Sequence, residues 1–324
     1  MNNTSASLAT NSVVVGGTVA IDNVKTPGSE AENLLGGSAS YAALAASFFT
    51  PSVHLVGIVG KDFPAEHLSM LEDRGISLDG IERSEGDSFT WSGEYMENMN
   101  ERVTHRVGLN VLEDWQVKVP ATAGQASIVV LANMSPDNQL QMLEQCGNPE
   151  AFVIADTMDL WIEIANERLH EVLCKLDLFV INEGEARDFA KTSNLVLAGQ
   201  RLLEKGPRYV VIKLGEFGAM LFGRHEGSIP VALCPDSFFR CAAFPLQEIA
   251  DPTGAGDTFL GAVAGFLAAG EGKAVDFEAI RQAVVQGSVL ASFTCEAFST
   301  RRLEKLDGED LEDRLAAFKA MSSW

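Results

Sequence analysis

Short, fully apolar runs alternate along most of the chain with segments of helical periodicity. Runs of this length that end in turn residues predict buried strands, here at 12–17, 53–60, 127–133, 152–157, 178–182 and 209–215. Helices are expected between them, at 38–49, 64–74, 136–146, 183–190 and 194–205. Strands that are apolar on both faces and separated by helices predict an α/β fold with a mostly parallel sheet covered on both sides.

The last third of the chain is predicted to be helical, at 254–269, at 276–297 and in an amphipathic helix near 308–320. No repeat of fixed period is visible in the sequence. We therefore expect one domain over residues 12–300, with residues 301–324 as its C-terminal helical segment.

One segment alternates strictly between polar and apolar positions, which predicts a half-exposed strand at 88–96. Its aromatic side chains share one face: Phe89, Trp91 and Tyr95. Residues 101–108 are expected to pair with it across a turn. Together with residues 18–30, the segment 88–110 predicts a small β-sheet that stands off the main domain. Its aromatic face must cover a ligand, a partner chain or the domain itself.

The charge balance limits the partners of this 324-residue chain, which carries 24 basic and 45 acidic residues for a formal net charge of −21. Binding to a nucleic-acid backbone needs clustered Lys and Arg, so no nucleic-acid partner is expected. A phosphate site in so acidic a protein must be built locally. No uninterrupted apolar run approaches 18 residues, so no membrane partner is expected either.

The N-terminal residues lack a basic region followed by an apolar one, so they do not resemble a signal peptide. The five cysteines include no C-x-x-C pair. Both features predict a reduced, cytoplasmic chain.

The segment IADPTGAGDTFLG, residues 249–261, places two glycines and an acid at the start of an apolar helix. Gly254 and Gly256 allow a tight turn in which backbone N–H groups point at one spot, and the helix dipole adds positive potential there. This predicts an anion pocket with Asp257 at its rim, where a base can act on an attacking hydroxyl. An ordinary glycine-rich turn capped by Asp257 is the alternative.

Neither common nucleotide-binding motif is present. The chain has no G-x-x-x-x-G-K-[ST] sequence, which excludes a P-loop, and no complete G-x-G-x-x-G opens a helix after the first strand. The second absence argues against a dinucleotide-dependent dehydrogenase.

The stretch DPTGAGDTF resembles the C-terminal signature of the ribokinase-like (PfkB) family of sugar and nucleoside kinases. Three further segments resemble family elements in the same order: LLGGSASYAALAASFF at 34–49, INEGEA at 181–186 and IKLGEFGAML at 212–221. The resemblance spans residues 12–300 and implies a three-layer α/β/α domain with a small β-sheet lid. It also implies a kinase that moves the terminal phosphate of a nucleoside triphosphate, expected to be ATP, to a hydroxyl of a sugar or nucleoside.

Roles for the residues around the anion pocket follow from the resemblance. Asp257 matches the catalytic base, and the amides of Gly254, Ala255 and Gly256 match the anion hole for the transferring phosphoryl group. In some members Asp251 and Thr253 correspond to positions that hold a monovalent cation such as K⁺.

The resemblance also implies a metal site. Asn182 and Glu185 match the pair that organises Mg²⁺ and the phosphates, largely through water. Hard oxygen ligands of this kind suit Mg²⁺. A solvated acid in the first turn of a helix is the alternative for Glu185.

On the acceptor side, Asp22 matches an acid that grips substrate hydroxyls, and Gly36 and Gly37 match a pair that lets the backbone approach the substrate. Ordinary turn residues are the alternative for all three. On the nucleotide side the resemblance implies contacts from Lys213, Gly215, Gly218 and Gln286, the last of which falls where the family lines the adenine pocket.

Two departures from the family bear on the acceptor. Tyr41 stands where sugar kinases often carry Asn, and Met134 stands near the place of an acid, which disfavours a plain ribose kinase. Lys213 stands where many members have Thr. With Trp91 over the expected substrate site, we expect a nucleoside or another bulky acceptor.

Packing of the aromatic face between subunits, or onto the base of the lid, is the alternative, so a monomer and a homodimer through the lid both stay open. A catalytically silent sugar- or nucleotide-binding protein of the same fold is the alternative function. Asp257 argues against it, because a pure binder gains nothing from a base.

Overall fold

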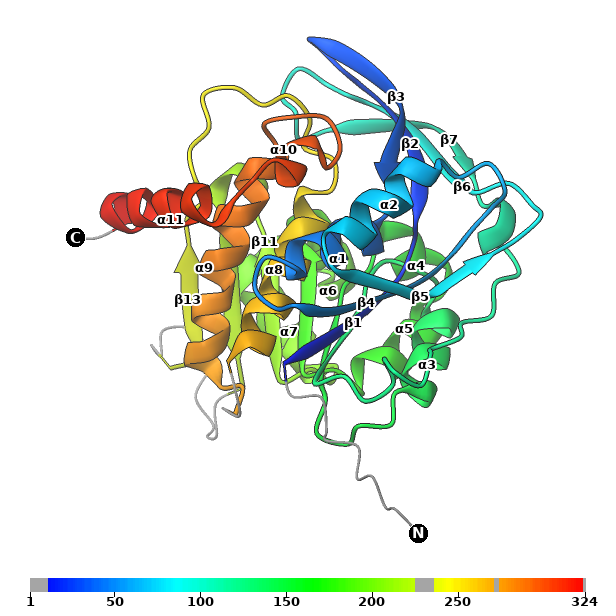
Figure 1. The fold of residues 1–324 in the computed structure, drawn as a ribbon. Helices are drawn as coiled ribbons and strands as arrows, with labels where there is room; N and C mark the ends of the chain where they lie inside the picture. Colours follow the sequence, from blue (N-terminus) through cyan, green and yellow to red (C-terminus); the bar gives the residue numbers. More distant parts are fainter. Residues whose placement is uncertain (1–10, 225–235, 271–273, 323–324) are drawn as a thin grey trace.

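The larger of two β-sheets runs through the centre of the molecule. The computed structural model describes residues 11–224, 236–270 and 274–322, and within them this sheet has nine strands in the order β13-β12-β11-β10-β9-β8-β1-β4-β5 (Figure 1). Their bounds are β1 Ser12–Gly16, β4 Ser52–Val59, β5 Ile76–Arg83, β8 Ile128–Leu131, β9 Phe152–Ala155, β10 Leu178–Asn182, β11 Tyr209–Lys213, β12 Ala219–Gly223 and β13 Phe238–Cys241. Neighbours from β5 to β11 pair in parallel, whereas β12 and β13 pair antiparallel at one edge.

Each apolar run predicted to be a strand forms one, so the mostly parallel sheet is confirmed. The sequence pattern missed β5, which is half-buried at the edge of the sheet and lacks a continuous apolar run. It also missed β12 and β13, which follow β11 without an intervening helix and so fall outside the strand–helix alternation.

Two layers of helices cover the sheet, and successive residues of β1 point into different layers. Val13 and Val15 lie in the cluster with one set of helices, and Val14 lies in the cluster with the other. The first layer contains α1 Ser38–Ala46, α2 Ala65–Asp73, α8 Ala255–Ala269, α9 Phe277–Thr294, α10 Arg301–Glu304 and α11 Gly308–Ser322. The second contains α3 Pro136–Gln145, α4 Asp159–Ile164, α5 Asn166–Leu173, α6 Glu183–Ala190 and α7 Leu195–Glu204, of which α4 and α5 were not predicted.

Helices α1 and α8 pack with almost no side chain between them. A β-carbon on Gly261 or Gly265 would overlap the backbone of Ala42 or Ala46. This close contact brings the first turn of α8 beside the first turns of α1, where two of the predicted motifs lie.

The second sheet is the expected lid, with the strand order β3-β2-β6-β7 (Figure 1). Its strands are β2 Ala20–Thr26, β3 Ser29–Gly36, β6 Phe89–Tyr95 and β7 Arg102–Gly108. The expected segment 18–30 was too short, because β3 continues to Gly36 and so joins the lid directly to α1. The lid has its own small core of Val24, Leu34 and Tyr95, against which Trp91 and Phe298 pack.

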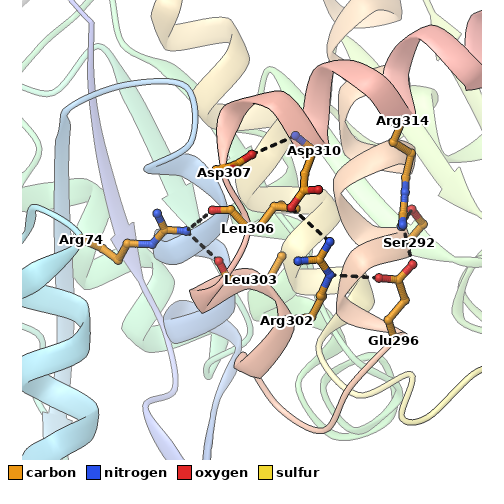
Figure 2. Close-up of polar contacts among 9 residues, drawn as sticks. All are labelled: Arg74, Ser292, Glu296, Arg302, Leu303, Leu306, Asp307, Asp310 and Arg314. Atoms are coloured by element: carbon orange, nitrogen blue, oxygen red, sulfur yellow. Dashed lines mark hydrogen bonds and ion pairs between the residues drawn. The ribbon is translucent and has the colours of Figure 1, made fainter.

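Polar contacts hold the C-terminal helices on the domain (Figure 2). Arg74, just after α2, donates to the carbonyl of Leu303 at 2.7 Å. Glu296, just after α9, accepts from both Arg302 and Arg314, and the Arg314 guanidinium lies 3.4 Å from the centroid of the Phe293 ring. These contacts hold residues 295–300 in place from the side of the C-terminal helices. The same residues reach the site described below.

Within the described ranges, no helix has both the length and the apolar character that crossing a bilayer requires. Cys146, Cys174, Cys241 and Cys295 are present as free thiols. Cys234 and Trp324 lie outside the described residues.

Candidate active site

The candidate site lies where the chain leaves the middle of the large sheet in two directions. From β1 it proceeds outward through β4 and β5, and from β8 it proceeds through β9 to β11 on the other side. Ligands of open α/β sheets bind at such a switch point, beyond the carboxyl ends of the strands. Here the Thr18 N–H and the Ser38 hydroxyl both donate to the carbonyl of Asn133, at 3.3 and 3.1 Å.

The first turn of α8 faces this switch point. Gly254, its N-cap, has a φ of 78°, and a β-carbon there would overlap the ring of Tyr41. The Ala255 N–H donates to the Pro252 carbonyl at 3.2 Å, so this expected anion-hole amide is occupied within its own turn. Gly256 follows in the first turn, whose N–H groups have no partner inside a helix.

Lys213 stands over this turn. Its Nζ lies 2.8 Å from the position that a β-carbon on Gly256 would take. Lys213 ends β11 beside Asn182, the last residue of β10. The ammonium group and the amides of the helix start therefore offer positive potential at one place.

Asp257 is half-buried on the same turn. Burial raises the pKa of its carboxyl, and the nearby charges of Lys213 and Arg102 act in the opposite direction. A carboxylate with a raised pKa is a stronger base than an exposed one, as proton abstraction from an alcohol requires.

Asp22 of the lid faces the same space and is 5% exposed. Burial raises the pKa of its carboxyl to about 8, helped by the charges of Asp251 and Asp257, while an N–H hydrogen bond from Gly37 opposes the shift. Its Oδ1 atom is buried and has no hydrogen-bond partner among the described residues. A buried, unpaired carboxylate oxygen at a switch point is suited to accept a ligand hydroxyl.

Gly36 and Gly37 are needed for packing at the joint between lid and α1. A β-carbon on Gly36 would overlap the carboxyl group of Asp22. Gly37 has a φ of 90°, and a β-carbon there would overlap the Thr18 carbonyl. Both positions exclude any larger residue.

Asp251 and Thr253 form a turn directly before α8, whose start is the predicted anion pocket. The Thr253 N–H donates to Asp251 Oδ1 at 2.9 Å and the Ser299 N–H donates to Oδ2 at 3.4 Å. Burial raises the pKa of Asp251, which is fully shielded from solvent. Ser299 has a φ of 59° and also donates its hydroxyl to the Leu35 carbonyl at 2.6 Å.

Asn182 and Glu185 form a reciprocal cap at the start of α6. The Glu185 N–H donates to Asn182 Oδ1 at 2.9 Å, and the Asn182 N–H donates to Glu185 Oε2 at 3.0 Å. Burial raises the pKa of Glu185, and Lys213 lowers it. The pair thus faces Lys213 and is not a purely solvated helix start.

Sequence reasoning missed Asp156, which follows β9 and is 4% exposed. Burial raises its pKa far above the ordinary value; Asp257 and Glu185 raise it too, and Lys213 opposes them. Its Oδ1 is buried with no hydrogen-bond partner in the described part of the chain. The signal was available, because an acid directly after a buried parallel strand lies at the same sheet edge as the other motifs.

The other predicted site residues take several places. Tyr41 is 2% exposed; its ring packs on Gly254 and its hydroxyl shares a hydrogen bond with Ser299, so any action on a substrate is indirect. Met134 is a core residue. Gln286 is half-buried on α9. Gly215 and Gly218, with φ of 57° and 91°, form the tight turn between β11 and β12.

The lid reaches both sides of this site through its β6–β7 hairpin. Thr253 donates its hydroxyl to the Tyr95 hydroxyl at 3.3 Å, and Tyr95 also forms a hydrogen bond with Arg102. At the hairpin turn, Asn100 donates to Glu216 at 3.2 Å, beside Gly215. Sequence reasoning missed Tyr95 as a link and Arg102 as a charge, because both depend on strand pairing.

Comparison with known proteins agrees with this arrangement. Residues 10–306 match the pfkB family carbohydrate kinase. The chain belongs to the pfkB family of carbohydrate kinases. The protein is therefore an enzyme of the sugar and nucleoside kinase group, and the resemblance of the four sequence motifs is confirmed.

Individual relatives of this pfkB kinase include nucleoside and sugar kinases. The cytidine kinase of Thermococcus kodakarensis is 28% identical over 262 residues, which cover 79% of this chain and 87% of that protein. A Burkholderia thailandensis nucleoside kinase solved with inosine has a TM-score of 0.74 at 17% identity, covering 94% of this chain and 97% of its own. An E. coli ribokinase-type protein solved with ATP and Mg²⁺ has a TM-score of 0.72 at 17% identity, covering 96% and 99%. The last two likenesses show the ribokinase-like fold.

Proposed function

We propose that this pfkB kinase transfers the terminal phosphoryl group of ATP to a hydroxyl of a nucleoside, with Asp257 as the base. The observation that carries the proposal is the position of Asp257 on the first turn of α8, between Lys213 and the face of the lid that holds Asp22. Lys213, on one side of Asp257, offers positive charge to a phosphoryl group. Asp22, on the other side, offers an unpaired carboxyl oxygen to a hydroxyl of the acceptor.

In this mechanism Asp22 binds a hydroxyl of the acceptor and aims a neighbouring hydroxyl at Asp257. As the new bond forms between the acceptor oxygen and the γ-phosphorus, the bond from that phosphorus to the bridging oxygen of ATP breaks and ADP leaves. Asp257 takes the proton of the attacking hydroxyl. The Gly256 amide, the helix dipole and Lys213 stabilise the charge on the transferring group.

A nucleoside acceptor is supported by the lid. Trp91 pairs directly with Asp22 in the parallel register of β6 and β2, so both side chains lie on the same face of the lid. The Trp91 indole packs on Gly93 and donates to Thr104 at 3.3 Å, which holds it on that face. An aromatic ring beside a carboxylate suits a ligand that combines a base with ribose hydroxyls. The cytidine kinase relative supports the same substrate class.

Mg²⁺ fits the oxygen-rich side of the site. Asp156 has an unpaired carboxylate oxygen, and Asn182 and Glu185 stand close to Lys213 across the phosphate region. Among the described residues, no group of three or more Asp, Glu, His or Cys side chains is arranged to hold a metal ion. This suits an ion that binds through one or two carboxylates and otherwise through phosphates and water. When bound, Mg²⁺ supplies charge neutralisation to the phosphates.

A monovalent cation such as K⁺ is proposed next to Asp251. The carboxyl is fully buried, and the N–H groups of Thr253 and Ser299 donate to it. A cation there would stabilise the charged form of Asp251 and hold the turn that carries Thr253 under the anion pocket.

The test is a phosphoryl-transfer screen of nucleosides and free sugars with ATP and Mg²⁺, with and without K⁺. We expect a nucleoside to be the best acceptor. Asp257→Asn should keep ATP binding and lower kcat by about 10²–10⁴-fold, because only the base is removed. A variant within threefold of wild-type kcat would exclude Asp257 as the base, and a free hexose as best acceptor would overturn the nucleoside assignment.

A further inference from the structure

The β6–β7 hairpin reaches from the start of α8 to the loop between β11 and β12, which contains Gly215 and Gly218. One end is fixed by the hydrogen bond from Thr253 to Tyr95, at 3.3 Å, two residues before Ala255. The tip is fixed by the hydrogen bond from Asn100 to Glu216, at 3.2 Å, in the loop after β11. Residues between these two anchors must therefore cross the opening where the phosphates of a bound nucleotide lie in the proposed function.

Arg102 follows the hairpin tip, lies directly across from Tyr95 and is on the inner face of the lid. In the antiparallel register Tyr95 pairs with Arg102, so the two side chains share a face. Tyr95 points to Thr253, and its hydroxyl also hydrogen-bonds Arg102. Arg106, on the same strand, pairs with Ser92 and so lies on the opposite face.

The charge of Arg102 reaches two carboxyl groups of the candidate site. It lowers the pKa of both Asp257 and Glu185. The side chain is nevertheless exposed, and no ion pair ties it to another residue of the described chain. Its guanidinium N–H groups outnumber the single hydroxyl of Tyr95, so most of them remain available to a ligand.

We propose that Arg102 is a further catalytic residue, which binds the transferring phosphoryl group from the lid side, opposite Lys213. The proposal rests on the proposed function. A guanidinium presents a fork of donors that matches phosphate oxygens, and it supplies charge where the leaving and attacking oxygens develop it. Lys213 approaches from the sheet, and Arg102 approaches from the lid.

The position of Arg102 also links acceptor binding to catalysis. Trp91 and Asp22 lie on the same face of the same small sheet, one and two strands away from β7 respectively. An acceptor held by Asp22 and Trp91 therefore contacts the same face of the lid from which Arg102 reaches the phosphoryl group.

The first test measures binding, so that it does not depend on finding the acceptor. In the presence of Mg²⁺, the affinities of ADP and of the non-hydrolysable β,γ-imido analogue of ATP are measured by calorimetry for wild type and Arg102→Gln. We expect the variant to bind the ATP analogue roughly 10–100-fold more weakly and to bind ADP as wild type does, because Arg102 contacts only the terminal group. Equal losses for both nucleotides, or no loss for either, would overturn the proposal.

The second test measures transfer with the best acceptor from the screen. Arg102→Gln should lower kcat by about 10²–10³-fold, and Arg102→Lys should recover part of the loss. Arg106→Gln, the matched control on the outer face, should stay within about twofold of wild type in both tests. If Arg106→Gln loses as much as Arg102→Gln, the effect is a general charge effect of the lid and the proposal fails.

The two proposals fail in different ways. If wild type transfers phosphate to no nucleoside or sugar, the proposed function is wrong, while the selective loss of the ATP analogue still supports the contact made by Arg102. If wild type is active and Arg102→Gln is equally active, the proposed function stands and the role of Arg102 is wrong.

Discussion

The carboxyl group of Asp22 lies directly over the α-carbon of Gly36, in the space that any side chain at position 36 would occupy. Gly36 pairs with Ala20 and Asp22 pairs with Leu34, so the two residues lie diagonally across β2 and β3, and the Gly37 N–H donates to the same carboxyl group. The joint between lid and α1 therefore sets the position of the acid that we assign to acceptor binding.

Gly36→Ala should displace the Asp22 carboxylate without touching the nucleotide side. We expect KM for the acceptor to rise by about tenfold or more, which corresponds to the loss of roughly one hydrogen bond. KM for ATP should stay within about twofold of wild type. Steady-state kinetics with each substrate varied in turn checks this, and a parallel rise in both KM values would show that the substitution disturbs the whole site. Gly28→Ala, in the open turn between β2 and β3, is the matched control because a β-carbon there meets no atom within 4 Å.

Asp22 should also make the stability of the unliganded protein depend on pH. Its pKa is about 8 in the folded protein against an ordinary value of 3.8, so the folded state holds a proton that the unfolded state releases between those values. The free energy of unfolding should therefore fall as pH rises from about 4 to 8. Asn mimics the protonated carboxyl, so Asp22→Asn should gain stability over wild type at pH 8 relative to pH 5.

The expected gain is at least ~1.4 kcal/mol, the equivalent of one pKa unit. Urea unfolding at pH 5 and pH 8 measures it. Asp313→Asn, at an exposed position of α11, should show no such difference between the two pH values. The prediction is wrong if Asp22→Asn changes stability equally at both.

Glu185→Gln should raise the Mg²⁺ concentration needed for half-maximal rate by roughly tenfold, in the range found for residues that hold a metal through water. Gln still accepts the N–H of Asn182 in the cap of α6, so the helix start is preserved. Glu183→Gln is the control, because Glu183 lies in the same turn but pairs with Arg187 at 3.3 Å. An unchanged Mg²⁺ dependence in Glu185→Gln would leave this residue as a helix cap alone.

Trp91→Ala should raise KM for a nucleoside acceptor by about 5–100-fold, because stacking of a base on an aromatic ring contributes roughly 1–3 kcal/mol. KM for ATP should not change. The same variant also loses the hydrogen bond to Thr104, so Thr104→Val provides the comparison that removes this bond and keeps the ring. If the two variants behave alike, Trp91 serves the lid itself and not the acceptor.

The local elements of this protein were predictable because each is specified by nearby residues. The apolar runs of the parallel strands and the starts of α6 and α8 depend on side chains a few positions apart, so α6 was predicted at its observed bounds, 183–190. The Asn182–Glu185 cap and the left-handed Gly254 are likewise local. For the same reason the four motifs identified the family before any contact was known.

Elements without a local signature were missed. Strand β5 shows no continuous apolar run because one side of it is open to solvent at the sheet edge. The helices α4 and α5 together occupy only residues 159–173 and meet without a loop of distinct composition.

The features of the site also separate into those set by nearby residues and those set by long-range packing. The sequence by itself determined that Asp257 opens a helix behind two glycines, and that Asn182 and Lys213 lie on buried strands. Only the tertiary structure decided that Lys213 stands over Gly256, that Asp156 joins the acidic group, and that Arg102 reaches Asp257 from the lid. These relations depend on the order and register of strands that are far apart in the sequence. Asp156 and Asp257 are more than 50 residues apart, and Arg102 and Asp257 are more than 100 residues apart. Local pattern carries no information about such pairings, because the free energy that fixes them comes from the packing of the whole sheet and its helices.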